Sequence, residues 1–486
     1  MNRIARVGGV GSRLAIPGSG GAYLVARYGL STLINLGNML VLTWWIGPHA
    51  YGIFVTAVGI ATFLASLTRA GVDTHLVRCP SAPTDQQYGV ASGIILVNSF
   101  ALLLAGFLVA PVLKHWYASQ EFTAPYLVLL FTLPLVGLAG PPMAKLERAL
   151  RFRTVASIEL GGQLAAFAVS AVLAWRGLGV WAPVAGHVVW QAVSITAAWL
   201  AAGIQPSVVF DRTQARTMLS FGLGYATSMR VWQLRTLVNP LLVGRVLGVE
   251  AVAFVGLAIR LVEGLSFLRI AAGRILLAML ARLQQDASAF RSTVQRTVQL
   301  QIAVLGPVLS LFGLVAPWVL PRIFGPRWVP ALAVYPMVAA AVLANVVFGV
   351  EASALFVLGK QWKVTRAYSI HVTLLSLGAC LLVPVFGIQG YGWAELGACA
   401  AYYWIHKELD PRLRPAMGAW AGWLAGFTGI LFAPLLRVQL LALLIVLLAA
   451  FVSPSVYRLV KSVLSRCGVS IDLSPIMCEE AGDRRP

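Results

Sequence analysis

The chain alternates long apolar runs with short polar segments over almost its whole length. About 20 apolar residues are needed to cross the hydrocarbon core of a bilayer as an α-helix. Fourteen apolar runs are candidates for such spans, at residues 22–46, 51–67, 90–113, 126–144, 154–175, 180–202, 218–242, 252–268, 298–320, 331–358, 364–385, 391–405, 417–435 and 440–459. The pattern predicts an all-α polytopic membrane protein with about 14 transmembrane helices.

A short internal repeat divides these spans into two pseudo-symmetric halves. Residues 46–50, after the first span, align with residues 247–251, after the seventh, and the same offset of 201 residues places Asn38 on Asn239. Paired bundles with a substrate site between them are a common plan of transporters. We therefore expect a basic cytoplasmic tail at 1–21, six-helix bundles at 22–206 and 207–410, an additional helix pair at 411–462 and a cytoplasmic tail at 463–486.

Composition and charge exclude several classes of protein. Hydrophobic residues make up 59% of the 486 residues and charged residues only 11%, which excludes a soluble enzyme or a secreted disulfide scaffold. The net charge of +20 is explained by basic cytoplasmic loops, so we expect no nucleic-acid partner. Alternate loops carry the clusters Arg69/Arg78, Lys145/Arg148/Arg151/Arg153, Arg212/Arg216, Arg282/Arg291/Arg296, Lys360/Lys363 and Lys407/Arg412/Arg414. This bias predicts that both termini are cytoplasmic.

Motifs of enzymes and of metal sites are missing from the sequence. The chain has no GxxxxGK[ST] phosphate loop, no HExxH motif and no CxxC pair, which are the signatures of a nucleotide or metal site. No extramembrane segment has the length of a separate catalytic domain. We expect no enzymatic activity, no metal and no cofactor.

Polar side chains inside the predicted spans are the candidates for function, because they are costly in a bilayer. In the first span, Arg27, Ser31, Asn35 and Asn38 recur at steps of four, four and three residues and share one helix face. A polar stripe of this length must face protein or water. Arg27 alone lies close enough to the end of its span to reach the head groups instead.

The seventh and eighth spans carry buried charges. Arg235 and Asn239 share one face of the seventh span, and Arg230 and Gln233 lie on another. In the eighth span Arg260 and Glu263 are three residues apart and therefore adjacent on the helix. The arginines either pair with a carboxylate, for which Glu263 is available, or face an anion.

Three arginines against one glutamate predict a positive interior, and guanidinium groups bind phosphate oxygens in pairs. We therefore expect Arg27, Arg230, Arg235 and Arg260 to bind a phosphorylated substrate. Ser31, Asn35, Asn38, Gln233 and Asn239 are expected to line its cavity. Glu263 and Glu351 are candidates for coupling to a proton or sodium ion. For Glu395, which shares a face of the twelfth span with Cys399, Tyr402 and His406, we favour contact with a neighbouring helix over a pathway.

Four short motifs resemble a known family. They are IGPHAYG at 46–52, LERALRF at 146–152, GLGVWA at 177–182 and GPRW at 325–328. Their order is similar to that in the Wzx-type polysaccharide exporters and lipid-linked oligosaccharide flippases of the multidrug/oligosaccharidyl-lipid/polysaccharide superfamily. The chain departs from the family at AMLAR, 278–282, and at Val238 or Asn239, where an acidic residue is common.

The resemblance implies a fold of two six-helix bundles around a central cavity. It implies a transporter that moves an undecaprenyl-diphosphate-linked oligosaccharide across the bacterial inner membrane. Alternating access, with one bundle rocking against the other, is a mechanism consistent with the residues. Expected partners are this lipid-linked sugar, membrane lipids and other polysaccharide-assembly membrane proteins. Two alternatives remain open: a membrane-embedded glycan polymerase or ligase, which should have a large periplasmic loop, and a peptidoglycan-precursor or drug exporter of the same fold.

Overall fold

The computed structural model describes residues 18–79, 82–117, 120–205, 207–416 and 418–435, and in these ranges every regular element is a helix. The first half contains α1 (Gly18–Thr68), α2 (Val72–Arg78), α3 (Asp85–Tyr117), α4 (Thr123–Leu130), α5 (Leu133–Leu138), α6 (Gly140–Arg148), α7 (Phe152–Trp175) and α8 (Trp181–Ala202). The chain divides into two compact units, Met1–Leu431 and Phe432–Pro486. All contacts described below lie within the first unit.

The second half is more interrupted than the first. It contains α9 (Arg212–Leu234), η1 (Arg235–Leu237), η2 (Asn239–Val243), α10 (Gly244–Leu247), α11 (Val249–Leu265), α12 (Phe267–Arg282), α13 (Ala287–Ile323), η3 (Pro326–Ala333), α14 (Tyr335–Val357), α15 (Gln361–Phe386), α16 (Ile388–Ala398), η4 (Cys399–Ala401), α17 (Tyr402–Glu408) and α18 (Gly418–Phe432).

The all-α transmembrane architecture is confirmed. Within the described ranges, eight helices are long and apolar enough to cross a membrane, among them α3, α7, α8, α13, α14 and α15. The predicted span at 440–459, the tail at 463–486, residues 1–17 and the side chain of Arg27 lie outside what the structure describes. The domain boundaries drawn from the sequence stay a prediction.

Four predicted spans differ in detail from the helices observed, among them the span at 391–405, which is divided among α16, η4 and α17. The span at 126–144 is divided among α4, α5 and α6, and the last two each begin with proline in their first turn, where its missing N–H breaks no helical hydrogen bond. The span at 252–268 ends at Leu265, after which α12 continues as a separate helix. The span at 218–242 changes at Arg235 from an α-helix to a 3₁₀ turn and then to a π-helix.

The internal repeat has the same backbone in both halves. Gly47 has φ 74° and ψ 174°, and Gly248, 201 residues later, has φ 86° and ψ 175°. Positive φ favours glycine because it has no Cβ. Each glycine ends one helical segment and begins the next, so the repeated motif is a turn between two antiparallel segments.

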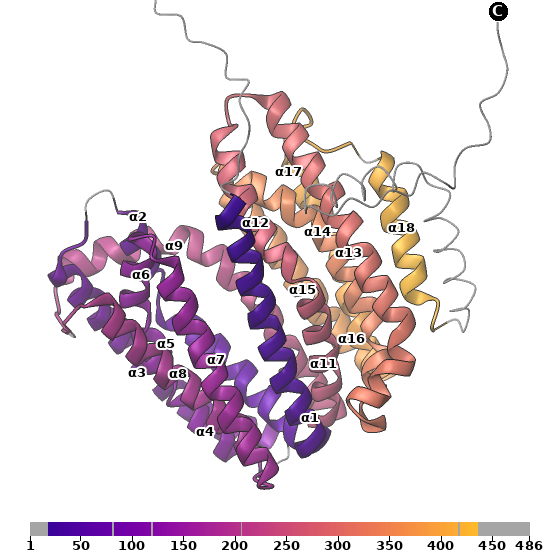
Figure 1. Ribbon diagram of the computed structural model, residues 1–486, viewed down its shortest axis with the longest axis horizontal. Helices are drawn as coiled ribbons and strands as arrows, with labels where there is room; N and C mark the ends of the chain where they lie inside the picture. The colour runs from indigo at the N-terminus through magenta and orange to yellow at the C-terminus, as the bar shows by residue number, and fades with distance from the viewer. Residues whose placement is uncertain (1–17, 80–81, 118–119, 206, 417, 436–486) are drawn as a thin grey trace, which may run out of the picture. The chain divides into compact units, whose positions relative to one another are not determined.

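Close contacts join the two halves near these turns. A Cβ on Gly52 would lie 2.0 Å from the backbone oxygen of Val249, so α1 and α11 pack backbone to backbone here, as Figure 1 allows the reader to follow. Trp328 of η3 is 1% exposed. Its ring meets Tyr51 edge-on at 5.6 Å between centroids, and its indole N–H donates to the carbonyl of Thr43 at 3.2 Å.

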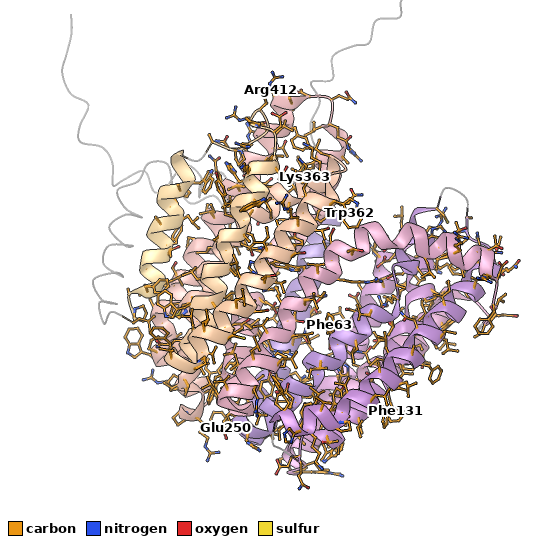
Figure 2. All side chains as sticks on the ribbon, turned by 180° about the vertical axis from the view of Figure 1, so that it is seen from behind. Phe63, Phe131, Glu250, Trp362, Lys363 and Arg412 are labelled. Carbon is orange, nitrogen blue, oxygen red and sulfur yellow. The ribbon has the colours of Figure 1, made fainter. Side chains whose placement is uncertain are left out.

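Charged residues from loops that are predicted to lie on opposite sides of the membrane are found at opposite ends of the helices. Figure 2 shows Lys363 and Arg412, from loops predicted to be cytoplasmic, at one end, and Glu250, from a loop on the other side, at the far end. This arrangement agrees with alternating loop sides along the chain.

Candidate functional site

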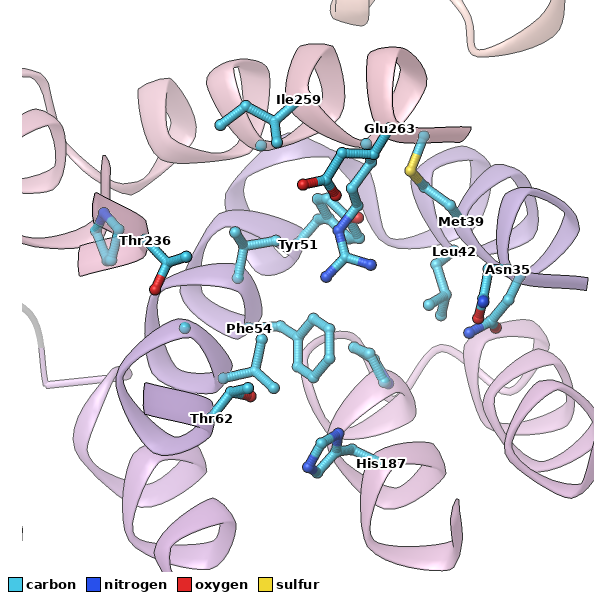
Figure 3. A pocket seen from close by; sticks show the side chains of 18 of the residues that line it. Asn35, Met39, Leu42, Tyr51, Phe54, Thr62, His187, Thr236, Ile259 and Glu263 are labelled. Carbon is cyan, nitrogen blue, oxygen red and sulfur yellow. The ribbon is translucent and has the colours of Figure 1, made fainter. Parts of the chain in front are cut away.

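A central cavity of about 460 Å³ lies between the two halves. Helices α1, α7 and α8 line it from the first half, and α9, η1, η2, α11 and α16 line it from the second. Figure 3 shows Asn35, Met39 and Tyr51 of α1 around the open space, with His187 and Glu263 on opposite sides in this view. The volume lies in the usual range for small-molecule sites.

The repeat builds this cavity from both halves. Seven lining residues of α1 have a partner exactly one repeat later that also lines the cavity. The pairs are Asn35/Thr236, Asn38/Asn239, Met39/Pro240, Val55/Gly256, Val58/Ile259, Gly59/Arg260 and Thr62/Glu263. The sequence alone shows two short matches at this offset, whereas the structure gives seven pairs of lining residues. The site therefore lies at the interface of two structural repeats.

The two walls of the cavity match in position but differ in charge. Where the first repeat has Gly59 and Thr62, the second has Arg260 and Glu263. All charged residues among the described lining side chains, which are these two and Arg235, come from the second half. The charge that was predicted inside the membrane therefore lies on one wall.

Arg235 is held by an ion pair on this wall. Its Nη1 donates to Oε1 of Glu395 at 3.2 Å, and the two side chains are 24% and 8% exposed. The guanidinium also lies over the Trp232 ring, 4.6 Å from its centroid. Glu263 was the carboxylate expected from the sequence to be available for pairing, whereas the observed partner of Arg235 is Glu395 of α16.

The helix containing Arg235 is irregular at this point because of Pro240, which has no backbone N–H to donate. The indole N–H of Trp116 donates to the carbonyl of Leu241 and the hydroxyl of Tyr117 to that of Pro240, both at 2.9 Å. Local π-helical geometry is frequent at functional sites. Here it lies in the segment that carries Asn239 to the cavity.

Arg260 and Glu263 are exposed to the cavity from α11. No ion pair or hydrogen bond joins either side chain to another group in the described part of the chain. Their spacing of three residues on one helix face is confirmed, but the expected contact between them is not made. Both groups are therefore available to a ligand.

A further arginine, Arg269 of α12, lies behind this wall. It donates to Oδ1 of Asn345, whose amide in turn donates to the hydroxyl of Tyr402 at 2.9 Å. Arg269 interacts electrostatically with both Arg235 and Glu263. The described lining of the cavity itself carries two guanidinium groups, from Arg235 and Arg260, and one carboxylate, from Glu263, which is a positive excess of one.

Arg230 lines a second cavity of about 350 Å³, next to the first. Thr62 and Gln233 line both cavities. The second cavity also contains Arg69 and Asp73, whose side chains approach to 3.7 Å. Of the four arginines predicted to bind phosphate, two therefore line the central cavity, Arg230 lines its neighbour, and the side chain of Arg27 is not described.

The other predicted site residues lie in different places. Asn35, Asn38, Gln233 and Asn239 line the central cavity. Ser31 reaches it indirectly, because its hydroxyl donates to Oε1 of Gln163 at 2.9 Å. Glu351 lies outside the cavity, fully buried, with Oε1 2.9 Å from Nδ1 of His406. Sequence reasoning missed the lining residues Gln163, His187 and Trp190, although two of them are polar groups inside apolar spans.

Comparison with known proteins identifies the family. The model of the family described as polysaccharide biosynthesis protein matches residues 41–333. The chain belongs to this family. A curated relative, the teichuronic acid biosynthesis protein TuaB of Bacillus subtilis (strain 168), is 22% identical over 381 residues, which are 77% of this chain and 74% of TuaB.

Solved transporter structures share the fold. The lipid II flippase MurJ in an inward closed conformation superposes with a TM-score of 0.72 over 94% of this chain and all of MurJ, at 11% identity. A multidrug resistance MATE family transporter in an inward-facing conformation gives 0.57 over 77% of this chain and 92% of the transporter, at 13% identity. The chain therefore shares the fold of these two proteins, and the family resemblance seen in the sequence is confirmed by the family match.

Proposed function

We propose that this protein flips or exports a lipid-diphosphate-linked oligosaccharide repeat unit across the bacterial inner membrane. The product would serve the biosynthesis of an exopolysaccharide, a capsule or an O-antigen. The observation that carries the proposal is the central cavity between two repeats, into which α11 presents the free guanidinium of Arg260. Family membership and the relative in teichuronic acid biosynthesis support a polysaccharide precursor as cargo.

The chemistry of the cavity wall suits a diphosphate. A guanidinium presents two parallel N–H donors to phosphate oxygens, and Arg260 has no competing partner among the described residues. Arg235 is already paired, so a phosphate group would compete with Glu395 for it. Arg269, which does not line the cavity, interacts electrostatically with Arg235 and Glu263 and adds positive charge near this wall. The polyprenyl tail of such a substrate would stay in the lipid.

Arg230 would act earlier on the substrate path. It faces the second cavity, which borders the central one at Thr62 and Gln233. Arg69, in the same cavity, belongs to a loop predicted to be cytoplasmic. With both termini cytoplasmic, the head group would meet Arg230 before Arg260, and rocking of the two halves would then expose the central cavity to the periplasm.

Ion coupling, where it exists, has a better candidate in Glu263 than in Glu351. Glu263 is exposed to the central cavity beside Arg260, where its charge would respond directly to bound phosphate. Glu351 is fully buried and held by His406, so it would act on the substrate only through a change in helix packing.

The alternatives are less well supported. A drug exporter for organic cations requires a net acidic cavity, whereas the described charged residues that line this one are two arginines and one glutamate. A glycan polymerase or ligase is expected to have a large periplasmic loop. In the described part of the chain, the longest connections between helices are residues 203–211 and 409–417, nine residues each.

The proposal is tested in cells of the source bacterium from which the gene has been deleted. We expect loss of the surface polysaccharide and accumulation of a lipid-linked glycan, both reversed by the wild-type gene. Arg260→Ala should fail to restore export. Arg260→Lys should restore it partly, because lysine keeps the charge but lacks the planar guanidinium with its paired N–H donors. The control is Arg176→Ala, which changes an exposed arginine at the end of α7 and should restore export fully.

Arg230→Ala should impair export more than Arg230→Lys for the same reason. Normal polysaccharide in the deleted strain, without any lipid-linked glycan accumulating, would refute the proposed function. Full export with Arg260→Ala would retain the function and remove this residue from the site.

A further inference from the structure

Among the described residues, the first-half wall of the central cavity carries no Lys, Arg, Asp or Glu but is rich in hydrogen-bonding and aromatic groups. Asn35 of α1, Gln163 of α7, and His187 and Trp190 of α8 all line it. Side-chain amides both donate and accept hydrogen bonds, as the hydroxyl groups of a sugar do. Aromatic rings offer a flat apolar face, which matches the C–H face of a sugar ring.

Trp190 is held in place by a gap in the facing helix. A Cβ on Gly162 of α7 would lie 2.6 Å from Cδ1 of Trp190 and 2.7 Å from Oγ of Ser194. Only glycine at position 162 leaves room for the indole ring in this position. The neighbouring His187 ring meets Trp190 edge-on, with centroids 6.1 Å apart and planes at 83°. The ring is therefore positioned before any ligand arrives.

The amide of Gln163 is also oriented in advance. The Ser31 hydroxyl donates to its Oε1 at 2.9 Å, which directs the amide nitrogen and its two N–H donors away from this bond. Nε2 of Gln191 lies 3.5 Å from Nε2 of His187 and supports the imidazole from the next turn. Asn35 is exposed to the cavity. Oriented polar groups of this kind provide specificity in ligand sites.

A ligand that fits both walls must be anionic at one end and neutral, hydroxylated and partly apolar at the other. We propose that Asn35, Gln163, His187 and Trp190 form a carbohydrate subsite that binds a sugar ring while the diphosphate lies against Arg260 on the opposite wall. Trp190 stacks on the ring, and Asn35 and Gln163 bond its hydroxyl groups. The inference rests on the proposed function and adds the orientation of the cargo in the cavity.

Binding to purified full-length protein in nanodiscs tests the subsite with two probes. One is the lipid-linked glycan extracted from cells that lack the gene, and the other is undecaprenyl diphosphate without sugar. Trp190→Ala should weaken binding of the glycan lipid about tenfold or more, the scale expected for a lost aromatic contact with its burial, and leave the sugar-free lipid unchanged. Arg260→Ala should weaken both.

Two further variants separate positioning and folding from binding. Gly162→Ala should reduce the preference for the glycan lipid in the same direction, because it displaces the indole ring. Trp175→Ala, which removes a tryptophan that is 72% exposed at the end of the same helix, should bind both lipids as wild type does. Unchanged binding of the sugar-free lipid by each variant also shows that it has folded.

The outcomes discriminate between the two ideas. If Trp190→Ala binds the glycan lipid as tightly as wild type, or weakens both lipids equally, the carbohydrate subsite is wrong while the flippase proposal stands. If wild type binds neither lipid, or no lipid-linked glycan accumulates without the gene, the proposed function fails and the subsite fails with it.

Discussion

Removing the charge of Glu395 should destabilise the protein far more than removing that of Glu263. Glu395 pairs with Arg235 at 3.2 Å and is 8% exposed, whereas Glu263 is exposed to the cavity. At this distance and an effective dielectric constant of about 20, the attraction is about 5 kcal/mol before desolvation is subtracted. Breaking such a pair typically costs about 3–5 kcal/mol, because the remaining charge is left buried.

The perturbation is Glu395→Gln, which keeps the shape of the side chain and removes the charge. Soluble proteins of this length have an unfolding entropy of about 1 kcal/mol per kelvin, so the expected loss is about 3–5 °C in Tm. Glu263→Gln is the matched control and should shift Tm by less than about 1 °C. The assay is thermal unfolding of the purified protein in one detergent, followed by intrinsic fluorescence.

A double substitution separates the ion pair from other effects at the site. Arg235→Leu combined with Glu395→Leu removes both charges and should be more stable than Arg235→Leu or Glu395→Leu alone, because replacing a buried pair by apolar groups is often neutral. The reasoning is refuted if Glu263→Gln destabilises as much as Glu395→Gln, or if the double variant is no better than the worse single one.

Three other predictions follow from contacts outside the cavity. Gly52→Ala would place a methyl group 2.0 Å from a carbonyl oxygen of α11 and should lower the free energy of unfolding by about 1–3 kcal/mol through overpacking. The control is Gly161→Ala, which has open space around it and should not lower Tm. Trp328→Ala should cost about 3–5 kcal/mol, measured as unfolding in denaturant; an unchanged midpoint would contradict its role in joining the halves. The hydrogen bond from Lys363 lowers the pKa of Glu408 below its ordinary value of 4.5. The pair therefore stabilises the protein fully above pH 4.5, and this stabilisation is lost as the pH falls through the lowered pKa. The difference in Tm between wild type and Lys363→Ala should shrink below pH 4.5.

Much of the fold was predictable because the bilayer imposes a strong constraint on the sequence. Apolar runs of sufficient length must be helices in hydrocarbon, and the offset of 201 residues located the two matching turns at Gly47 and Gly248. The polar stripe of α1 was interpretable for the same reason. Asn35 and Asn38 could not face lipid without cost, and both line the cavity.

The partners of the charged residues were not predictable. Arg235 and Glu395 are 160 residues apart, and nothing local relates them, whereas Glu263 lies in the next predicted span. Arg269 lies just beyond the predicted span at 252–268, yet the chain turns at Ser266 into α12 and keeps this side chain within the packed helices. Hydropathy marks where a span ends, but it does not mark where helix packing ends.

The carbohydrate subsite was missed for a related reason. Gln163, His187 and Trp190 are single polar or aromatic residues in otherwise apolar spans, where such residues often only contact a neighbouring helix. What distinguishes them is that α7 and α8 bring all three to one cavity, with Trp190 packed against Gly162, and this requires the packing of the two helices to be known. The steps of three and four between His187, Trp190 and Gln191 were the available signal.

The central claim is most directly tested by flipping of a fluorescent undecaprenyl-diphosphate oligosaccharide in proteoliposomes, with and without a proton or sodium gradient. The comparison includes wild type, Arg260→Ala, Arg176→Ala and protein-free vesicles. We predict that the fluorescent lipid is flipped by wild type and by Arg176→Ala, and that it is not flipped in vesicles without protein. Flipping by Arg260→Ala should be at least about tenfold slower, because a hydrogen bond to a charged group contributes about 1.5–3 kcal/mol. Absence of movement with folded wild-type protein under every gradient would contradict the account.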